Sequence, residues 1–216
     1  MSAKGLAEFV FAGAARRRSI VRNFKFPSLG EGVGRAVYYS AALSAIRAYL
    51  RAECNPGILA DAIQSLELKV QELSGKKANR LKKARAENNI RAIHVYSRQF
   101  GDKKFKLLPS PHLRLKIGNV TVTATPDLMV ESRGRKFLIK LDLGKKKLTA
   151  ELIELLLHLF HEAARSARID VEAENILYLE SLTGLTYKCP ARSRPLQRTV
   201  ESGCQAFAEM WEDIPD

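Results

Sequence analysis

The stretch PDLMVESRGRKFLIKLDLGKKK, residues 126–147, decides the fold of this chain. Apolar and polar residues alternate on both sides of the sequence SRGR, a pattern that predicts two strands joined by a tight turn. Residues two apart in a strand point to the same side. Lys140 and Asp142 therefore share one face of the second strand, and the apolar residues around them lie on the other. Asp127, which follows Pro126 at or near the end of the preceding strand, is expected beside this pair.

The flanking segments predict an α/β (α+β) fold with a central mixed sheet flanked by helices. Upstream, the pattern indicates a short helix in the first 25 residues that ends in a basic cluster, a loop at 26–34, and helices at 35–53 and 57–73. Residues 75–100 form a third helix or a continuation of the second. Strands are expected at 105–110, 112–118, 120–132 and 136–143. A helix capped by Thr149 follows at 149–167, then a strand pair at 175–190 and a closing helix at 197–214. We expect an N-terminal helical region, 1–100, and an α/β core, 101–216, in one compact unit.

The composition points to a polyanionic partner. The chain has 216 residues and a net charge of +13, so it is long enough for a core and basic enough to meet nucleic acid. A basic, solvated surface or an acidic protein partner is the alternative. Its three cysteines are far apart and predict neither a zinc site nor a disulfide framework. No apolar stretch is long enough for a membrane span, and the first apolar segment precedes its arginines, the reverse of a signal peptide. We expect a cytoplasmic protein with no membrane partner.

The hairpin also carries candidate chemistry. Two carboxylates and an ammonium group that meet at the edge of a sheet suit a divalent metal and a phosphate oxygen. In this arrangement Asp127 and Asp142 would hold Mg²⁺ or Mn²⁺. Lys140 would orient the attacking water or the phosphate.

These residues resemble a known family of nucleases. The runs ATPDLMV, KFLIKLDLGKKK and ELIELLLHLF are similar in order and spacing to the PD-(D/E)XK superfamily, in particular its RecB-like and Cas-associated exonuclease domains. Asp127 matches the first acid of that family, and the pairs Leu138-Ile139 and Gly144-Lys145 match its apolar pair and its exit from the strand. The resemblance implies a restriction-endonuclease-like core, here with an N-terminal helical extension, and a metal-dependent activity on nucleic acid.

The sequence departs from the family at the centre of the motif. The second acid of the family falls on Lys140, and its lysine falls on Asp142. The glutamine and tyrosine of its helix fall on Glu154 and His158, and Tyr38 stands where an upstream histidine is expected. One acid is therefore kept and the pair that follows is inverted.

The inverted pair leaves two functions open. In the first, the chain is a metal-dependent nuclease that hydrolyses phosphodiesters of DNA or RNA, with Asp127 and Asp142 as ligands and Glu154, or Glu151, as a third. In the second, Lys140 and Asp142 pair with each other. The chain is then a non-catalytic nucleic-acid-binding or scaffolding subunit of a defence, mobile-element or repair complex.

Three groups of basic residues are candidates for contact with phosphates, and DNA is expected more than RNA. One lies directly beyond the metal motif, one forms a stripe on the third long helix, and one lies in the hairpin turn. A solvated helix face and a simple charged turn are the alternatives for the last two. The candidates are Lys145, Lys146 and Lys147; Lys76, Arg80 and Lys83; Arg133 and Arg135. Protein partners in a larger complex are also expected.

Overall fold

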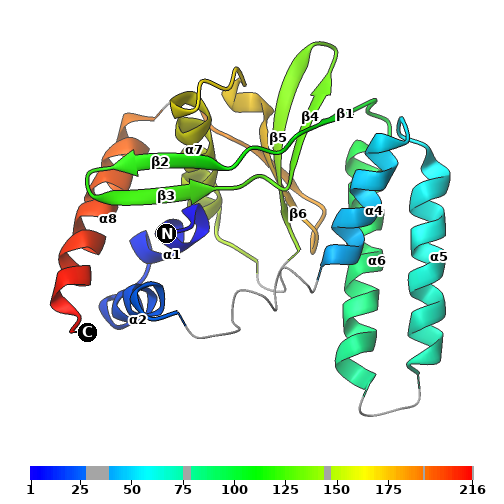
Figure 1. Ribbon diagram of the computed structural model, residues 1–216, viewed down its shortest axis with the longest axis horizontal. Helices are drawn as coiled ribbons and strands as arrows, with labels where there is room; N and C mark the ends of the chain where they lie inside the picture. Colours follow the sequence, from blue (N-terminus) through cyan, green and yellow to red (C-terminus); the bar gives the residue numbers. More distant parts are fainter. Residues whose placement is uncertain (28–38, 75–78, 144–146, 192, 216) are drawn as a thin grey trace.

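The computed structural model describes residues 1–27, 39–74, 79–143, 147–191 and 193–215. Most of the predicted loop at 26–34 lies outside these ranges, as do Tyr38, Lys76, Lys145 and Lys146. Within the described residues the predicted α/β class is confirmed, because helices flank a mixed sheet (Figure 1). No helix in these ranges is both long and apolar enough to cross a lipid bilayer.

In the described ranges, the helices that precede the strands are α1 (Ala3–Val10), α2 (Ala14–Lys25), α4 (Ser40–Arg51), α5 (Pro56–Glu72) and α6 (Arg80–Phe100). The strands β1 (Lys106–Leu108), β2 (Leu113–Ile117), β3 (Val120–Ala124), β4 (Leu128–Ser132) and β5 (Arg135–Asp142) come next. The chain then forms α7 (Ala150–Ser166), a short 3-10 turn (Ala173–Asn175), β6 (Ile176–Glu180), β7 (Thr186–Lys188) and α8 (Arg194–Asp213).

Among the described residues, the main sheet has five strands in the order β1-β4-β5-β6-β7. β5 and β6 are parallel and joined through α7, whereas the other neighbours are antiparallel. The strand predicted at 120–132 is wrong as one element, because β3 pairs with β2 in a separate sheet and β4 belongs to the main one. Pro126 lies at the break, where its missing N–H prevents a continuous ladder.

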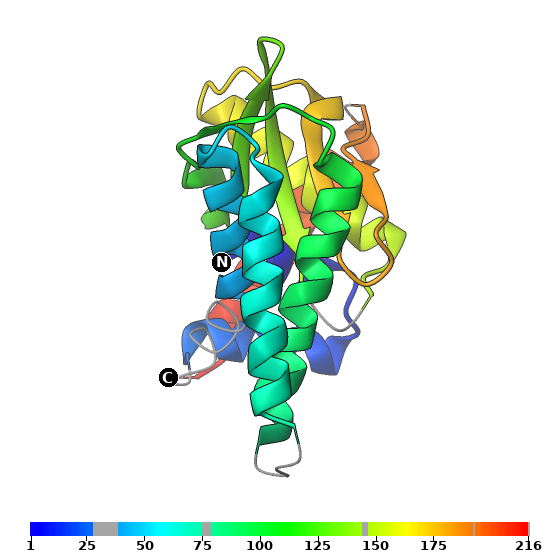
Figure 2. The same cartoon turned by 90° about the vertical axis from the view of Figure 1, so that its right-hand side faces the viewer.

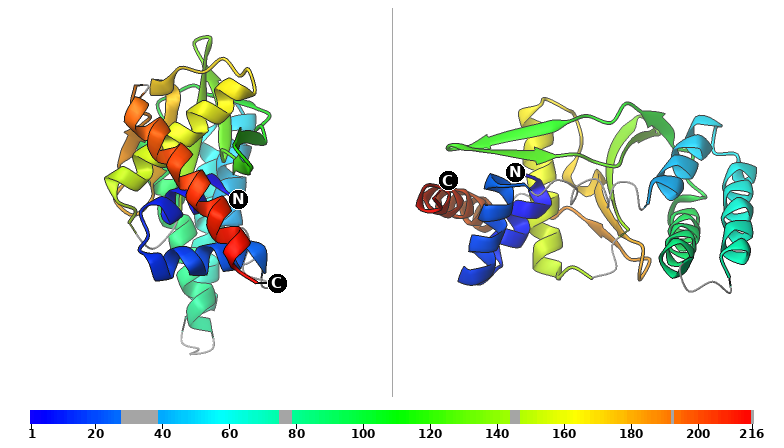
Figure 3. Two further views of the ribbon diagram at one scale, coloured as in Figure 1. Left: turned by 90° about the vertical axis from the view of Figure 1, so that its left-hand side faces the viewer. Right: turned by 60° about the horizontal axis from the view of Figure 1, so that its bottom comes forward.

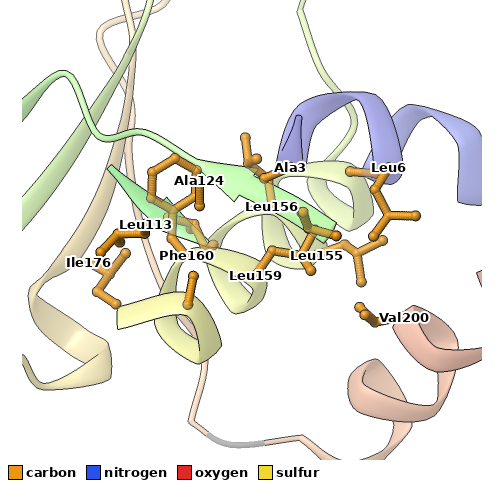
Figure 4. Close-up of a cluster of buried hydrophobic side chains, with 14 of the residues drawn as sticks. Ala3, Leu6, Leu113, Ala124, Leu155, Leu156, Leu159, Phe160, Ile176 and Val200 are labelled. Atoms are coloured by element: carbon orange, nitrogen blue, oxygen red, sulfur yellow. The ribbon is translucent and has the colours of Figure 1, made fainter. Parts of the chain in front are cut away.

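Helices cover both faces of the main sheet. On one face α4, α5 and α6 stand together, and the apolar residues of β5 that include Ile139 and Leu141 belong to this core (Figure 2). On the other face α7 packs between the sheet and α8, with α1, α2 and the β2–β3 hairpin around it (Figure 3). Side chains from α1, β2, β3, α7, β6 and α8 converge there (Figure 4).

Local sequence signals explain where several helices begin. Thr149 caps α7 as predicted, since its hydroxyl accepts a hydrogen bond from the Leu152 N–H at 3.4 Å. The prediction of one helix in the first 25 residues that ends in Arg16–Arg18 is wrong. The chain breaks at Gly13, which has extended angles before α2, and the three arginines lie inside that second helix.

Candidate functional site

Asp127 and Lys140 meet at the end of the β4–β5 ladder. The Asp127 N–H donates to the Ile139 carbonyl at 3.0 Å, which extends the pairing one residue beyond β4. The Lys140 ammonium lies 3.0 Å from Oδ2 of Asp127 and 3.2 Å from Oδ1. Oδ2 also accepts a hydrogen bond from the Leu141 N–H at 2.8 Å. Both oxygens of this carboxylate are therefore engaged.

Asp142 lies two residues further along β5, on the same face as Lys140. Leu138, on that face, belongs to the core around α7, while Ile139 and Leu141 belong to the opposite core, so the predicted shared face is confirmed. The side chain of Asp142 is buried and accepts a hydrogen bond from the Tyr178 hydroxyl of β6. The pairing of Lys140 with Asp142 is not what forms, because the ammonium reaches back to Asp127 instead.

Tyr178 holds its proton firmly. Burial raises the pKa of the phenol, and its hydrogen bond to Asp142 and the nearby charges of Asp142 and Glu180 raise it further. The hydroxyl is therefore a donor to the aspartate across the ordinary pH range. The Tyr178 hydroxyl therefore occupies one oxygen of Asp142, a residue that the sequence predicted as a metal ligand.

The ligand set expected for Mg²⁺ or Mn²⁺ does not come together. Glu154 lies on an exposed face of α7, as does Glu151. Across the described ranges, no three His, Cys, Asp or Glu side chains are grouped closely enough to hold a metal ion. The Asp127 carboxylate already receives the Lys140 ammonium and the Leu141 N–H, with which a metal ion would have to compete. The expected donor set thus does not fit the metal, and no chemical step is derived through it.

The predicted basic residues lie in separate places. Lys147 is exposed just beyond β5, and Arg80 is exposed on α6, where Lys83 lies 4.0 Å from Glu87. Arg133 and Arg135 lie at the tip of the β4–β5 hairpin. At about 3.3 Å per residue, the tip is roughly 17–23 Å along the strand from Lys140. The described members of the three predicted groups therefore do not form one surface around the carboxylates.

A basic surface runs along the edge strand β1, and among its cations sequence reasoning had predicted Arg133 and Arg135. One hollow of about 1000 Å³ lies between α4 and β1, and a second of about 820 Å³ lies between residues 102–105 and the β4–β5 hairpin. The hollows share Lys104 and Phe105, so they adjoin, and we call them together the β1 groove. The cations that line it are Arg47, Arg51, Lys103, Lys104, Lys106, Arg133 and Arg135.

The β1 groove has a strong excess of positive charge. Against these seven cations, the acidic residues among its described lining are Glu53 and Asp102. Arg47 connects the groove to the aspartate, because its Nη2 donates to the backbone carbonyl of Asp127 at 2.9 Å. A weak signal was present in the sequence: Arg47 and Arg51 are four apart on one helix face, and DKKFK (102–106) is basic. The two segments become neighbours only in the folded protein, where α4 packs beside β1.

The chain matches no protein-family model and no curated protein sequence.

Proposed function

We propose that this protein binds nucleic acid through the β1 groove, on a domain that resembles the PD-(D/E)XK fold, without cutting it through Asp127. The observation that carries the proposal is the gathering of seven cations against two carboxylates along one strand edge. The order β4–β5–α7–β6, with the last two strands parallel, supports the resemblance in fold.

The groove has the chemistry that a phosphate backbone requires. Arg51, Lys104 and Lys106 are exposed, so their charges are available to an incoming polyanion. Each phosphate neutralised by a lysine or arginine releases counterions, which makes binding favourable at low salt and weak at high salt. Phe105, shared by both hollows, is buried, so the contacts expected here are with phosphates rather than with stacked bases.

The bonding of the two aspartates supports binding over cleavage. The carboxylate of Asp127 is held by Lys140 and the Leu141 N–H, and Asp142 accepts from Tyr178. In addition, α4 belongs to the core on the face of the sheet opposite to Lys140 and Asp142. A nucleic-acid strand bound against α4 would therefore not lie over the carboxylates of Asp127 and Asp142.

A metal-dependent nuclease is the second candidate. The observation in its favour is that Asp127, Lys140 and Asp142 lie on one face of the sheet within one corner of the molecule. Displacement of Lys140 from Asp127 by a metal ion would be the first requirement of that function.

The two candidates separate in one experiment. Wild type and Asp127→Ala are incubated with single- and double-stranded DNA and RNA in EDTA, Mg²⁺ or Mn²⁺, and both binding and chain length are measured. We expect binding that weakens steeply with salt in all three buffers, no cleavage, and the same affinity for both proteins. Cleavage by the wild type that disappears in Asp127→Ala would establish the nuclease instead. Binding that is insensitive to salt would contradict the phosphate contacts.

A further inference from the structure

Glu180, at the end of β6, is a buried carboxylate with one oxygen unused. The residue is 1% exposed, and its Oε2 accepts a hydrogen bond from the Thr183 hydroxyl. Its Oε1 is buried and makes no hydrogen bond with any described residue. A buried charged oxygen without a partner is strongly unfavourable, more so than a neutral one. A ligand at this oxygen would remove that penalty.

A second carboxylate lies beside it. The parallel register of β5 and β6 places Asp142 opposite Glu180, on strands that run about 4.8 Å apart. Both side chains lie on the face of Tyr178, whose hydroxyl is bonded to Asp142 and whose phenol is close enough to Glu180 to sense its charge. Two adjacent buried carboxylates repel each other unless a cation or a shared proton lies between them.

The described residues do not supply that cation to Glu180. No lysine or arginine in the described ranges forms an ion pair with it, and the nearby Lys140 ammonium is bound to Asp127 at 3.0 Å. Thr183, whose hydroxyl donates to Glu180, is itself exposed.

The position in the fold is also one where ligands bind. Asp142 and Glu180 lie at the carboxyl ends of the two parallel strands that α7 joins, the edge of an α/β sheet that ligands prefer. Carboxylate oxygens are the donors that hard divalent cations take. We propose that Asp142 and Glu180 form a binding site for a hard divalent cation of the Mg²⁺ or Mn²⁺ class. This site differs from the one expected from the sequence, because it uses Glu180 and leaves Asp127 with Lys140.

Thermal unfolding of the full chain tests the site without any activity assay. With EDTA removed and Mn²⁺ or Mg²⁺ added to about 100 times the Kd, the Tm of the wild type should rise by about 5–10 °C. Glu180→Gln should abolish this rise. In EDTA the same variant should be at least as stable as the wild type, since it removes one of two adjacent buried charges. The matched control Glu172→Gln, an exposed acid just before β6, should keep the full response.

Titration calorimetry of the wild type with Mn²⁺ keeps the proposal testable if the variant does not fold. One ion bound per chain is expected, and no binding at millimolar Mn²⁺ would overturn the site. An equal rise in Tm for Glu180→Gln would also overturn the site. So would a wild type that is stabilised by mild acid but not by metal, because that result would indicate a proton shared by Asp142 and Glu180. The cation site and the proposed function are tested independently. Nucleic-acid binding through the β1 groove is expected in EDTA, where no divalent cation is bound.

Discussion

Asp127 and Lys140 should be energetically coupled, and a double-mutant cycle measures that coupling. The ammonium lies 3.0 Å and 3.2 Å from the two carboxylate oxygens, and the side chains of Lys140 and Asp127 are 29% and 22% exposed. At 3.0 Å the bare attraction is about 5 kcal/mol at an effective dielectric constant of 20. The loss of hydration of both groups offsets most of it.

We therefore expect a coupling energy of about 1–2 kcal/mol, above the 0.2–1 kcal/mol of fully exposed pairs. Urea unfolding of the wild type, Asp127→Ala, Lys140→Ala and the double variant gives the value. Asp127→Ala should be the more destabilising single change, because it also removes the acceptor of the Leu141 N–H.

The Arg135–Glu174 pair is the matched control. Its atoms are 4.0 Å apart and its side chains are 70% and 65% exposed, so its coupling should fall below about 0.5 kcal/mol. A coupling for Asp127 and Lys140 no larger than that of the control would refute the reasoning. The carboxylate would then be accessible to other ligands, and the argument against cleavage would lose its basis.

Two further predictions concern stability. Thr149→Ala should destabilise the protein by about 1 kcal/mol in urea unfolding through loss of the cap of α7, while Thr149→Ser should stay close to the wild type; equal values for both would contradict the cap. Burial raises the pKa of Cys204 from 9.0 to about 11 and that of Cys189 from 9.0 to about 12, and burial with contacts to Cys54 raises the pKa of Tyr49 to about 12. The unfolded chain releases these protons first, so the contribution of these three groups to the free energy of unfolding should be constant below about pH 8. It should fall from about pH 9 to 12, by about 1.4 kcal/mol per pH unit for each group ionised only when unfolded. Stability that stays constant to pH 11, or a slope that Cys204→Ala does not reduce, would contradict this assignment.

Local pattern was sufficient for the hairpin that carries the site. The alternation of apolar and polar residues in 136–143 predicted that Lys140 and Asp142 share one face, and Thr149 predicted the start of α7. These features depend on neighbours within a few residues, where strand and helix periodicity act directly.

The partners of the charged groups required the tertiary structure. Asp142 meets Tyr178 and Glu180 only because α7 returns the chain to lie parallel to β5 in one register, and a shift of one residue would turn these side chains to the other face. Lys140 reaches Asp127 because the antiparallel ladder continues one residue past β4.

The sequence predicted Arg133 and Arg135 of the β1 groove, but the groove as a whole also required the tertiary structure. Arg47 and Arg51 on α4 are more than fifty residues from Lys104 and Lys106 in the sequence, and they become neighbours only when α4 packs beside β1. The basic stripes that local spacing singled out, on α6 and beyond β5, gave no information about this long-range contact.

The salt dependence of binding to a single-stranded oligonucleotide tests the central claim most directly. The variant Arg51→Gln, Lys104→Gln, Lys106→Gln removes three exposed charges from the β1 groove, and Lys69→Gln, Lys188→Gln, Arg198→Gln removes three exposed charges elsewhere. If the groove holds the phosphates, the slope of log K against log salt becomes shallower by about 2 in the first variant, at about 0.7 per contact, and is unchanged in the second. Equal slopes for both variants and the wild type would contradict binding at this groove.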